Sequence, residues 1–99
     1  MLNLESKYIE IIQNMFSEQL KTENYDLYVF GSRSKNNNGK YSDIDISFQG
    51  QNILSLKEIL TLKHEFEYSE IPYKIDIIDL NSCNSEFLEM IQDDLILIS

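Results

Sequence analysis

The sequence predicts an α/β (α+β) fold in which helices flank a small mixed β-sheet. Two observations predict it. Apolar residues recur at helical spacing in two long segments and one shorter one, and three short segments between them are rich in aromatic and β-branched residues or alternate polar with apolar residues. These two kinds of segment interleave along the chain. A chain of 99 residues can build one modest core, so we expect a single domain over residues 1–99.

The first half of the chain is expected to form a helix and two strands. The helix is predicted over residues 4–21, with Asn3 as its N-cap, from the apolar spacing that begins at Leu4 and Tyr8. A strand is predicted from Tyr25 to Phe30. A polar run over residues 35–40 reads as a loop, and the alternation in residues 43–48 predicts the next strand.

The second half is expected to form helix, strand, helix and a short tail. Ser55 and Glu58 match a capping box at the start of a helix over residues 56–69. Pro72 is expected to terminate any preceding helix, and a strand is predicted over residues 73–78. A shorter helix is predicted over residues 85–93, and residues 95–98 form a short strand or a strip packed on the core.

Charge and composition exclude several classes of protein. Eight basic and 17 acidic residues give a net charge of −9, which argues against broad nucleic-acid binding. Cys83 is the single cysteine, so no internal disulfide can form and a cytoplasmic protein is the default. Charged residues interrupt the first 13 residues, and no apolar stretch approaches about 20 residues, so neither a signal peptide nor a membrane span is expected.

Three aspartates are the candidate catalytic and metal-binding residues. Asp43 and Asp45 are two positions apart on one predicted strand, so their side chains share a face. Asp76 joins them if its strand is a neighbour. Three carboxylates on one face repel each other without cations, and such hard oxygen ligands suit Mg²⁺. Two Mg²⁺ ions bridged by these carboxylates would assist in-line attack on phosphorus.

The candidate phosphate-binding turn, Gly31-Ser32, is separated from Asp43 by ten residues. Gly31 would let the backbone approach a phosphate closely, and the Ser32 hydroxyl can donate a hydrogen bond to phosphate oxygens. Arg33, Lys35 and Lys40 place three of the eight basic residues in the same loop. An Asp-x-Asp pair alone is weak evidence, but its fixed spacing from Gly-Ser is much rarer by chance.

These residues give the chain a resemblance to a known superfamily. Gly31-Ser32-Arg33, then Ser42-Asp43-Ile44-Asp45-Ile46, with Asp76 on a later strand, resemble the polymerase-β-type nucleotidyltransferases. The short chain is similar to the minimal nucleotidyltransferase (MNT, MntA-like) antitoxins of HEPN/MNT toxin–antitoxin pairs. The resemblance spans nearly the whole chain and implies a nucleotidyltransferase fold.

The resemblance also implies a reaction and a role for each site residue. The expected reaction transfers AMP from magnesium-bound ATP to a tyrosine of the partner HEPN RNase toxin and releases pyrophosphate. Asp43 and Asp45 would bind both metal ions, and Asp76 would bind the catalytic ion and help deprotonate the hydroxyl. Gly31, Ser32, Arg33 and Lys35 would contact the nucleotide.

Two departures from the family pattern keep alternatives open. Lys35 and Asn36 stand where the family often has Arg-Gly, which lowers the expected affinity for the triphosphate. One alternative is therefore an antitoxin that caps its toxin sterically without catalysis. Another is a nucleotidyltransferase for a small hydroxylated molecule.

Other polar residues have simpler interpretations. Asp79 lies three residues past Asp76 on the opposite face, so a turn or capping role is expected. His64 is expected to be a solvated helix residue, and Cys83 a loop thiol without a role. Tyr41, beside the predicted metal-binding strand, is a candidate for the mouth of the site.

Overall fold

A computed structural model describes residues 4–21, 24–30 and 43–98 of the chain. Its elements are α1 (Ser6–Gln19), β1 (Tyr25–Phe30), β2 (Ile44–Gly50), α2 (Leu56–Glu67), β3 (Ile75–Asp79), the 3₁₀ turn η2 (Leu80–Ser82), α3 (Ser85–Ile91), the 3₁₀ turn η3 (Gln92–Asp94) and β4 (Ile96–Leu97). The sheet order is β3-β2-β1-β4. β1 pairs antiparallel with β2 and β4, whereas β2 and β3 are parallel. This mixed sheet flanked by helices confirms the predicted α/β class.

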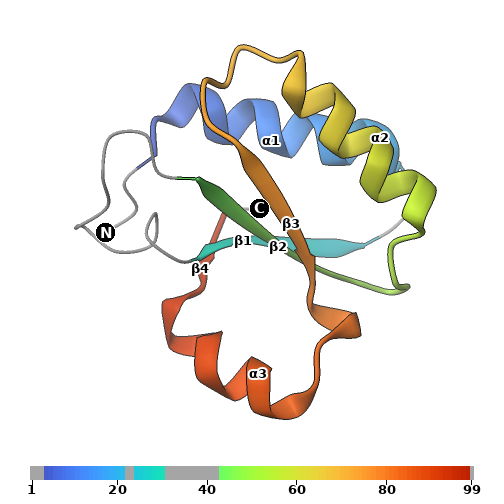
Figure 1. Cartoon of the computed structure of the whole chain (residues 1–99), viewed down its shortest axis with the longest axis vertical. Coiled ribbons are helices and arrows are strands. Elements are labelled where there is room, and N and C mark those ends of the chain that lie inside the picture. The colour runs from blue at the N-terminus through green and yellow to red at the C-terminus, as the bar shows by residue number, and fades with distance from the viewer. Residues whose placement is uncertain (1–3, 22–23, 31–42, 99) are drawn as a thin grey trace.

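Helices cover the sheet unequally. α1 and α2 lie on one side of it, and α3 lies on the other side (Figure 1). Alternate strand residues Leu27, Val29, Ile44, Ile46 and Phe48 are buried against α1 and α2, because successive side chains of a strand point to opposite faces. The main core therefore lies between the sheet and these two helices.

α1 and α2 are amphipathic, as their apolar spacing predicted. α1 buries Tyr8, Ile12 and Phe16. It is shorter than the predicted 4–21, and the proposed Asn3 cap is wrong: the N-cap is Glu5, which makes no side-chain capping bond. α2 has the predicted capping box, in which the Ser55 Oγ accepts from the Glu58 N–H at 3.1 Å and Glu58 accepts from the Ser55 N–H at 2.8 Å.

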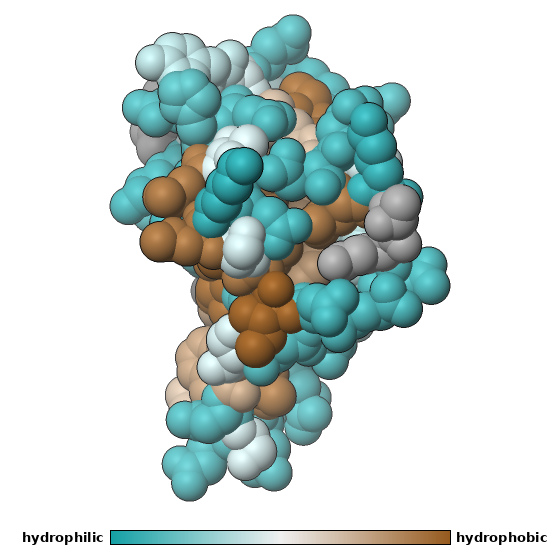
Figure 2. Space-filling model, turned by 90° about the vertical axis from the view of Figure 1, so that its right-hand side faces the viewer, coloured by the Kyte–Doolittle hydropathy of each residue, from teal (hydrophilic) through white to brown (hydrophobic). Residues whose placement is uncertain are grey.

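α3 forms a separate lobe. In Figure 2 the lower part of the molecule, which α3 builds, joins the upper part across a narrower, partly hydrophobic region. Leu80 of η2 and Ile91 of α3 are buried, outside the main core cluster. The tail pairs Leu97 with Tyr28 of β1, so the predicted short strand is confirmed. No described helix is long and apolar enough to cross a membrane.

Candidate active site

Parallel pairing places two of the three candidate carboxylates side by side. Asp45 of β2 is the direct partner of Asp76 of β3, on neighbouring strands about 4.8 Å apart. Residues opposite each other in a sheet point to the same face. β2 and β3 are neighbouring strands, which is the condition for Asp76 to join Asp43 and Asp45 on one face.

Asp43 lies on the same face, immediately before β2. It is two residues from Asp45 and exposed, whereas Asp45 and Asp76 are half-buried. This face points away from α1 and α2, because the intervening Ile44 is buried in the core. Asp45 and Asp76 thus lie side by side near the start of β2, and Asp43 precedes them on the same face.

The electrostatics of Asp45 show that these carboxylates interact. Burial raises the pKa of its carboxyl group above the ordinary value, and the charges of Asp76 and Asp43 raise it further. Both effects disfavour the ionised form. A cation at this place would offset the repulsion, and hard carboxylate oxygens are the donors that Mg²⁺ prefers. The donor set therefore fits magnesium.

Asp45 and Asp76 are the two carboxylates that strand pairing brings together. No group of three His, Cys, Asp or Glu residues in the described ranges stands ready to hold an ion. A pair of carboxylates suits Mg²⁺, which usually keeps several water molecules and binds through one or two carboxylates and substrate phosphates.

The predicted nucleotide-binding residues cannot be placed beside the carboxylates. β1 ends at Phe30, whose partner across the sheet is Asp45. Gly31, Ser32, Arg33 and Lys35 lie outside the described residues, as does Tyr41. Their contact with the nucleotide stays a prediction.

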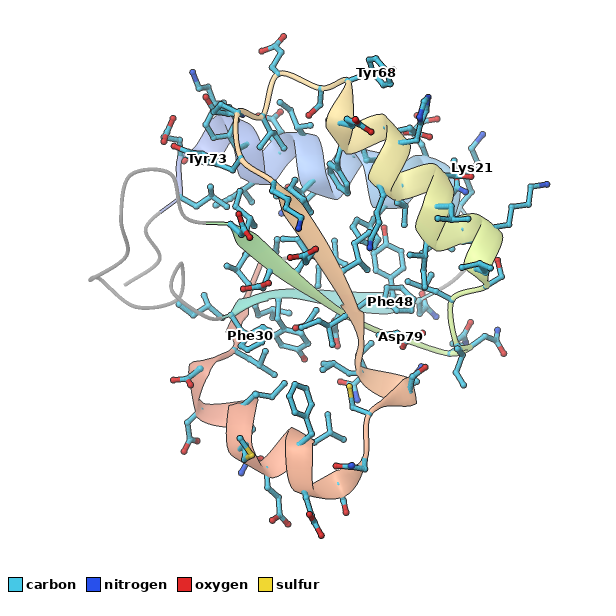
Figure 3. All side chains as sticks on the ribbon, in the orientation of Figure 1. Lys21, Phe30, Phe48, Tyr68, Tyr73 and Asp79 are labelled. Carbon is cyan, nitrogen blue, oxygen red and sulfur yellow. The ribbon has the colours of Figure 1, made fainter. Side chains whose placement is uncertain are left out.

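Asp79 is a structural residue, as predicted. Its side chain is buried and accepts from the Leu54 N–H at 2.6 Å and from the Asn81 N–H at 3.0 Å. It also caps η2. In Figure 3, Asp79 lies at the end of β3, far from Tyr73 at the other end. The carboxylate thus ties β3 to the segment that precedes α2.

Replacing Asp79 by alanine is expected to lower stability without disabling the site. It leaves the Leu54 and Asn81 N–H groups without their acceptor, which costs about 2 to 3 kcal/mol. Urea unfolding measures the loss, with exposed Asp93→Ala as the matched control. The AMP transfer that the family resemblance implies, measured per folded molecule, should stay within a few-fold of wild type. Loss of all AMP transfer in folded protein would instead give Asp79 a catalytic role.

His64 and Cys83 lie on α2 and directly after η2. His64 is exposed on α2, with its ring 4.8 Å from that of Tyr68. The Cys83 thiol faces the Asp79 carbonyl at 3.4 Å. The exposure of His64 confirms that it is a solvated helix residue.

A cleft beside Asp76 is the feature that sequence reasoning missed. It has a volume of about 480 Å³ and lies between the C-terminal part of α2 and β3. Its lining includes Lys63, Phe66, Tyr73, Lys74 and Asp76. The spacing of these residues gives no motif, because the cleft exists only once α2 packs beside β3.

Comparison with known proteins agrees with the geometry. Residues 6–99 match the family described as polymerase beta, nucleotidyltransferase. The probable protein adenylyltransferase MntA of Haemophilus influenzae is 28% identical over 91 residues, covering 92% of this chain and 78% of that protein.

Two solved structures share the fold. One is the tri-AMPylated Shewanella oneidensis HEPN toxin in complex with MNT antitoxin, with a TM-score of 0.74 and 18% identity over 97% of this chain and 72% of the matched one. The other is a toxin–antitoxin with AMP-PNP, with a TM-score of 0.69 and 21% identity over 88% of this chain and 72% of the matched one. The match of the family over almost the whole length shows that the chain belongs to the polymerase-β nucleotidyltransferase family.

Proposed function

We propose that this chain is the antitoxin of a HEPN/MNT pair and transfers AMP from ATP to a tyrosine of its partner HEPN toxin. The observation that carries the proposal is the adjacency of Asp45 and Asp76 in the sheet of a nucleotidyltransferase. The similar proteins support a protein acceptor: one is a probable protein adenylyltransferase, and another is an AMPylated HEPN toxin in complex with an MNT antitoxin. The tyrosine is the acceptor that the family resemblance implies. We place the reaction in the cytoplasm and assign it to residues 1–99 as one catalytic domain.

Asp43, Asp45 and Asp76 would hold two Mg²⁺ ions. When bound, these ions would supply positive charge that offsets the repulsion among the carboxylates and stabilises the oxygens of the triphosphate. The proposed contacts of Gly31, Ser32, Arg33 and Lys35 with the triphosphate add hydrogen-bond donors and positive charge.

The reaction is an in-line displacement at the α-phosphorus of ATP. The tyrosine oxygen forms a bond to that phosphorus while the bond from the phosphorus to the oxygen bridging to the β-phosphate breaks. Pyrophosphate leaves with the electron pair. Asp76 accepts the phenolic proton and then returns it to solvent, so the carboxylate is regenerated.

Protection of cells tests this function against steric capping. Wild type co-expressed with the HEPN toxin is expected to restore growth, whereas a variant with Asp43, Asp45 and Asp76 all changed to asparagine is expected to fail. Co-purification of this variant with the toxin is the control for binding. Full protection by the triple variant would show that capping, and not catalysis, neutralises the toxin.

A further inference from the structure

Lys74 is a basic residue beside the strand that carries Asp76. It lies directly before β3 and is exposed. Its carbonyl accepts from the Ile44 N–H at 2.8 Å, which extends the β2–β3 pairing by one residue beyond the Ile44–Ile75 pair. The sheet that holds Asp76 therefore also holds the backbone of Lys74, whose side chain has no part in the mechanism proposed above.

Strand alternation places Lys74 on the face of the carboxylates. Lys74 and Asp76 are two residues apart, so their side chains point to the same face, about 7 Å apart along the strand. Ile75 between them is buried in the main core. Because Ile75 is the partner of Ile44, Lys74 lies beside Asp43, one residue earlier on each strand. Lys74 thus neighbours Asp76 along its own strand and Asp43 across the sheet.

This position sets Lys74 apart from the other basic residues that the structure describes. The other lysines belong to α1 or α2 or follow α1 closely: Lys7, Lys21, Lys57 and Lys63. Those helices lie on the side of the sheet opposite to the carboxylate face (Figure 1). Lys74 forms no ion pair with another described residue. Its ammonium group is therefore available to a substrate that binds at the carboxylate face.

The strand order indicates which substrate Lys74 faces. β1 lies on one side of β2, and β3 lies on the other. In the sequence, β1 leads into Gly31-Ser32, the proposed phosphate-binding turn, and its last residue is the partner of Asp45. We therefore expect the triphosphate over β1 and β2, and the acceptor hydroxyl over β3, where Asp76 takes its proton. Lys74 is on the acceptor side of the site.

We propose that the Lys74 ammonium group donates a hydrogen bond to the acceptor oxygen and stabilises the negative charge that develops on it. The proposal rests on the nucleotidyl transfer proposed above. A phenol has a pKa of about 10, so its oxygen is costly to charge at neutral pH. One positive charge held where negative charge develops lowers that cost. The phenolic proton still passes to the Asp76 carboxylate, and the ammonium group keeps its own protons throughout.

Single-turnover transfer to the HEPN toxin at saturating ATP tests the proposal. Lys74→Ala is expected to slow transfer about a hundredfold, the usual effect of removing one group that stabilises transition-state charge. KM for ATP should stay within about twofold of wild type, because the triphosphate lies over the other strands. Lys74→Arg keeps the charge and should recover most of the rate. Lys63→Ala, exposed on α2, is the matched control and should leave the rate unchanged.

A more acidic acceptor separates this role from others. Toxin produced with difluorotyrosine in place of tyrosine loses its phenolic proton more easily and needs less help from Lys74. The deficit of Lys74→Ala should therefore shrink to about tenfold or less. An equal deficit with both acceptors would overturn the proposal. A raised KM for ATP with an unchanged transfer rate would also overturn it, since Lys74 would then belong to the triphosphate.

Metal binding gives a readout that does not depend on transfer. Mn²⁺, which also suits carboxylate ligands, is titrated onto the nucleotide-free protein, and the free ion is measured by EPR. The charge of Lys74 repels a cation beside Asp43 and Asp76, so Lys74→Ala should bind Mn²⁺ about threefold more tightly at low salt. An unchanged affinity would place the ammonium group away from the carboxylates and overturn the proposal. Absence of Mn²⁺ binding by wild type would reject the proposed metal site, and absence of transfer would reject the proposed function itself.

Discussion

Replacing Asp45 by asparagine is expected to lower AMP transfer at least about a thousandfold, because it removes a charge on which the transition-state electrostatics depend. The side chain keeps its shape, so the fold should persist. Asp26→Asn is the matched control, since Asp26 is an exposed aspartate at the other end of the same sheet. Transfer is measured with labelled ATP and the HEPN toxin. Activity in the Asp45 variant equal to that of the control would remove this residue from the site.

The same substitution is expected to stabilise the protein in the absence of metal. Burial and the neighbouring Asp76 and Asp43 raise the pKa of Asp45 in the folded state. The folded chain therefore holds the proton more tightly than the unfolded chain, and stability falls as pH rises through the raised pKa. Asparagine has no charge to lose, so at neutral pH it should gain roughly 0.5 kcal/mol, a value kept small by solvent screening.

The pH dependence identifies the cause of this gain. In EDTA, the melting temperature of the Asp45 variant should exceed that of wild type at pH 7. The difference should shrink below about pH 4 and close near pH 3, where the carboxyl group is protonated in both states. A difference that stays constant with pH would assign the gain to packing and not to charge.

Replacing Phe48 by alanine is expected to cause the largest loss of stability. Phe48 is fully buried, with its ring centroid 6.2 Å from that of Phe16 and 5.6 Å from that of Tyr25. A Cβ added at Gly50 would lie 2.5 Å from its ring, so the backbone also closes on this side chain. Removal leaves a cavity that costs about 3 to 5 kcal/mol, a large part of the stability of a small domain.

Urea unfolding measures this loss against a matched control. Phe87→Ala removes the same atoms from α3, where the side chain is half-buried and outside the main core cluster. Its cost should be less than half that of Phe48→Ala. Equal costs for the two variants would contradict the placement of the main core between the sheet and the helices α1 and α2.

Local patterns predicted the elements well because their causes are local. β1 has the predicted bounds, Tyr25–Phe30, and Ser55 begins α2 through a capping box readable from two residues. The predicted ends of strands were less accurate where tertiary contacts determine them. β2 continues past the predicted Phe48 to Gly50, because Gly50 still pairs with Tyr25. β3 begins at Ile75 and not at Tyr73, whose ring packs on Tyr8.

The site was predictable in part for the same reason. Strand alternation put Asp43 and Asp45 on one face from the sequence alone. The placement of Asp76 directly beside Asp45 needed the strand order, which no local pattern contains. The cleft with Lys63 and Lys74 needed the packing of α2 beside β3. The roles of Gly31, Ser32, Arg33 and Lys35 stay predictions.

Intact-mass spectrometry of the HEPN toxin tests the central claim most directly. The toxin is incubated with this chain, Mg²⁺ and ATP, and with the Asp45→Asn variant in parallel. Wild type is expected to add the mass of one or more AMP groups, located on a tyrosine by fragmentation, while the variant adds none. An unmodified toxin with wild type, or equal modification by both proteins, would contradict the account.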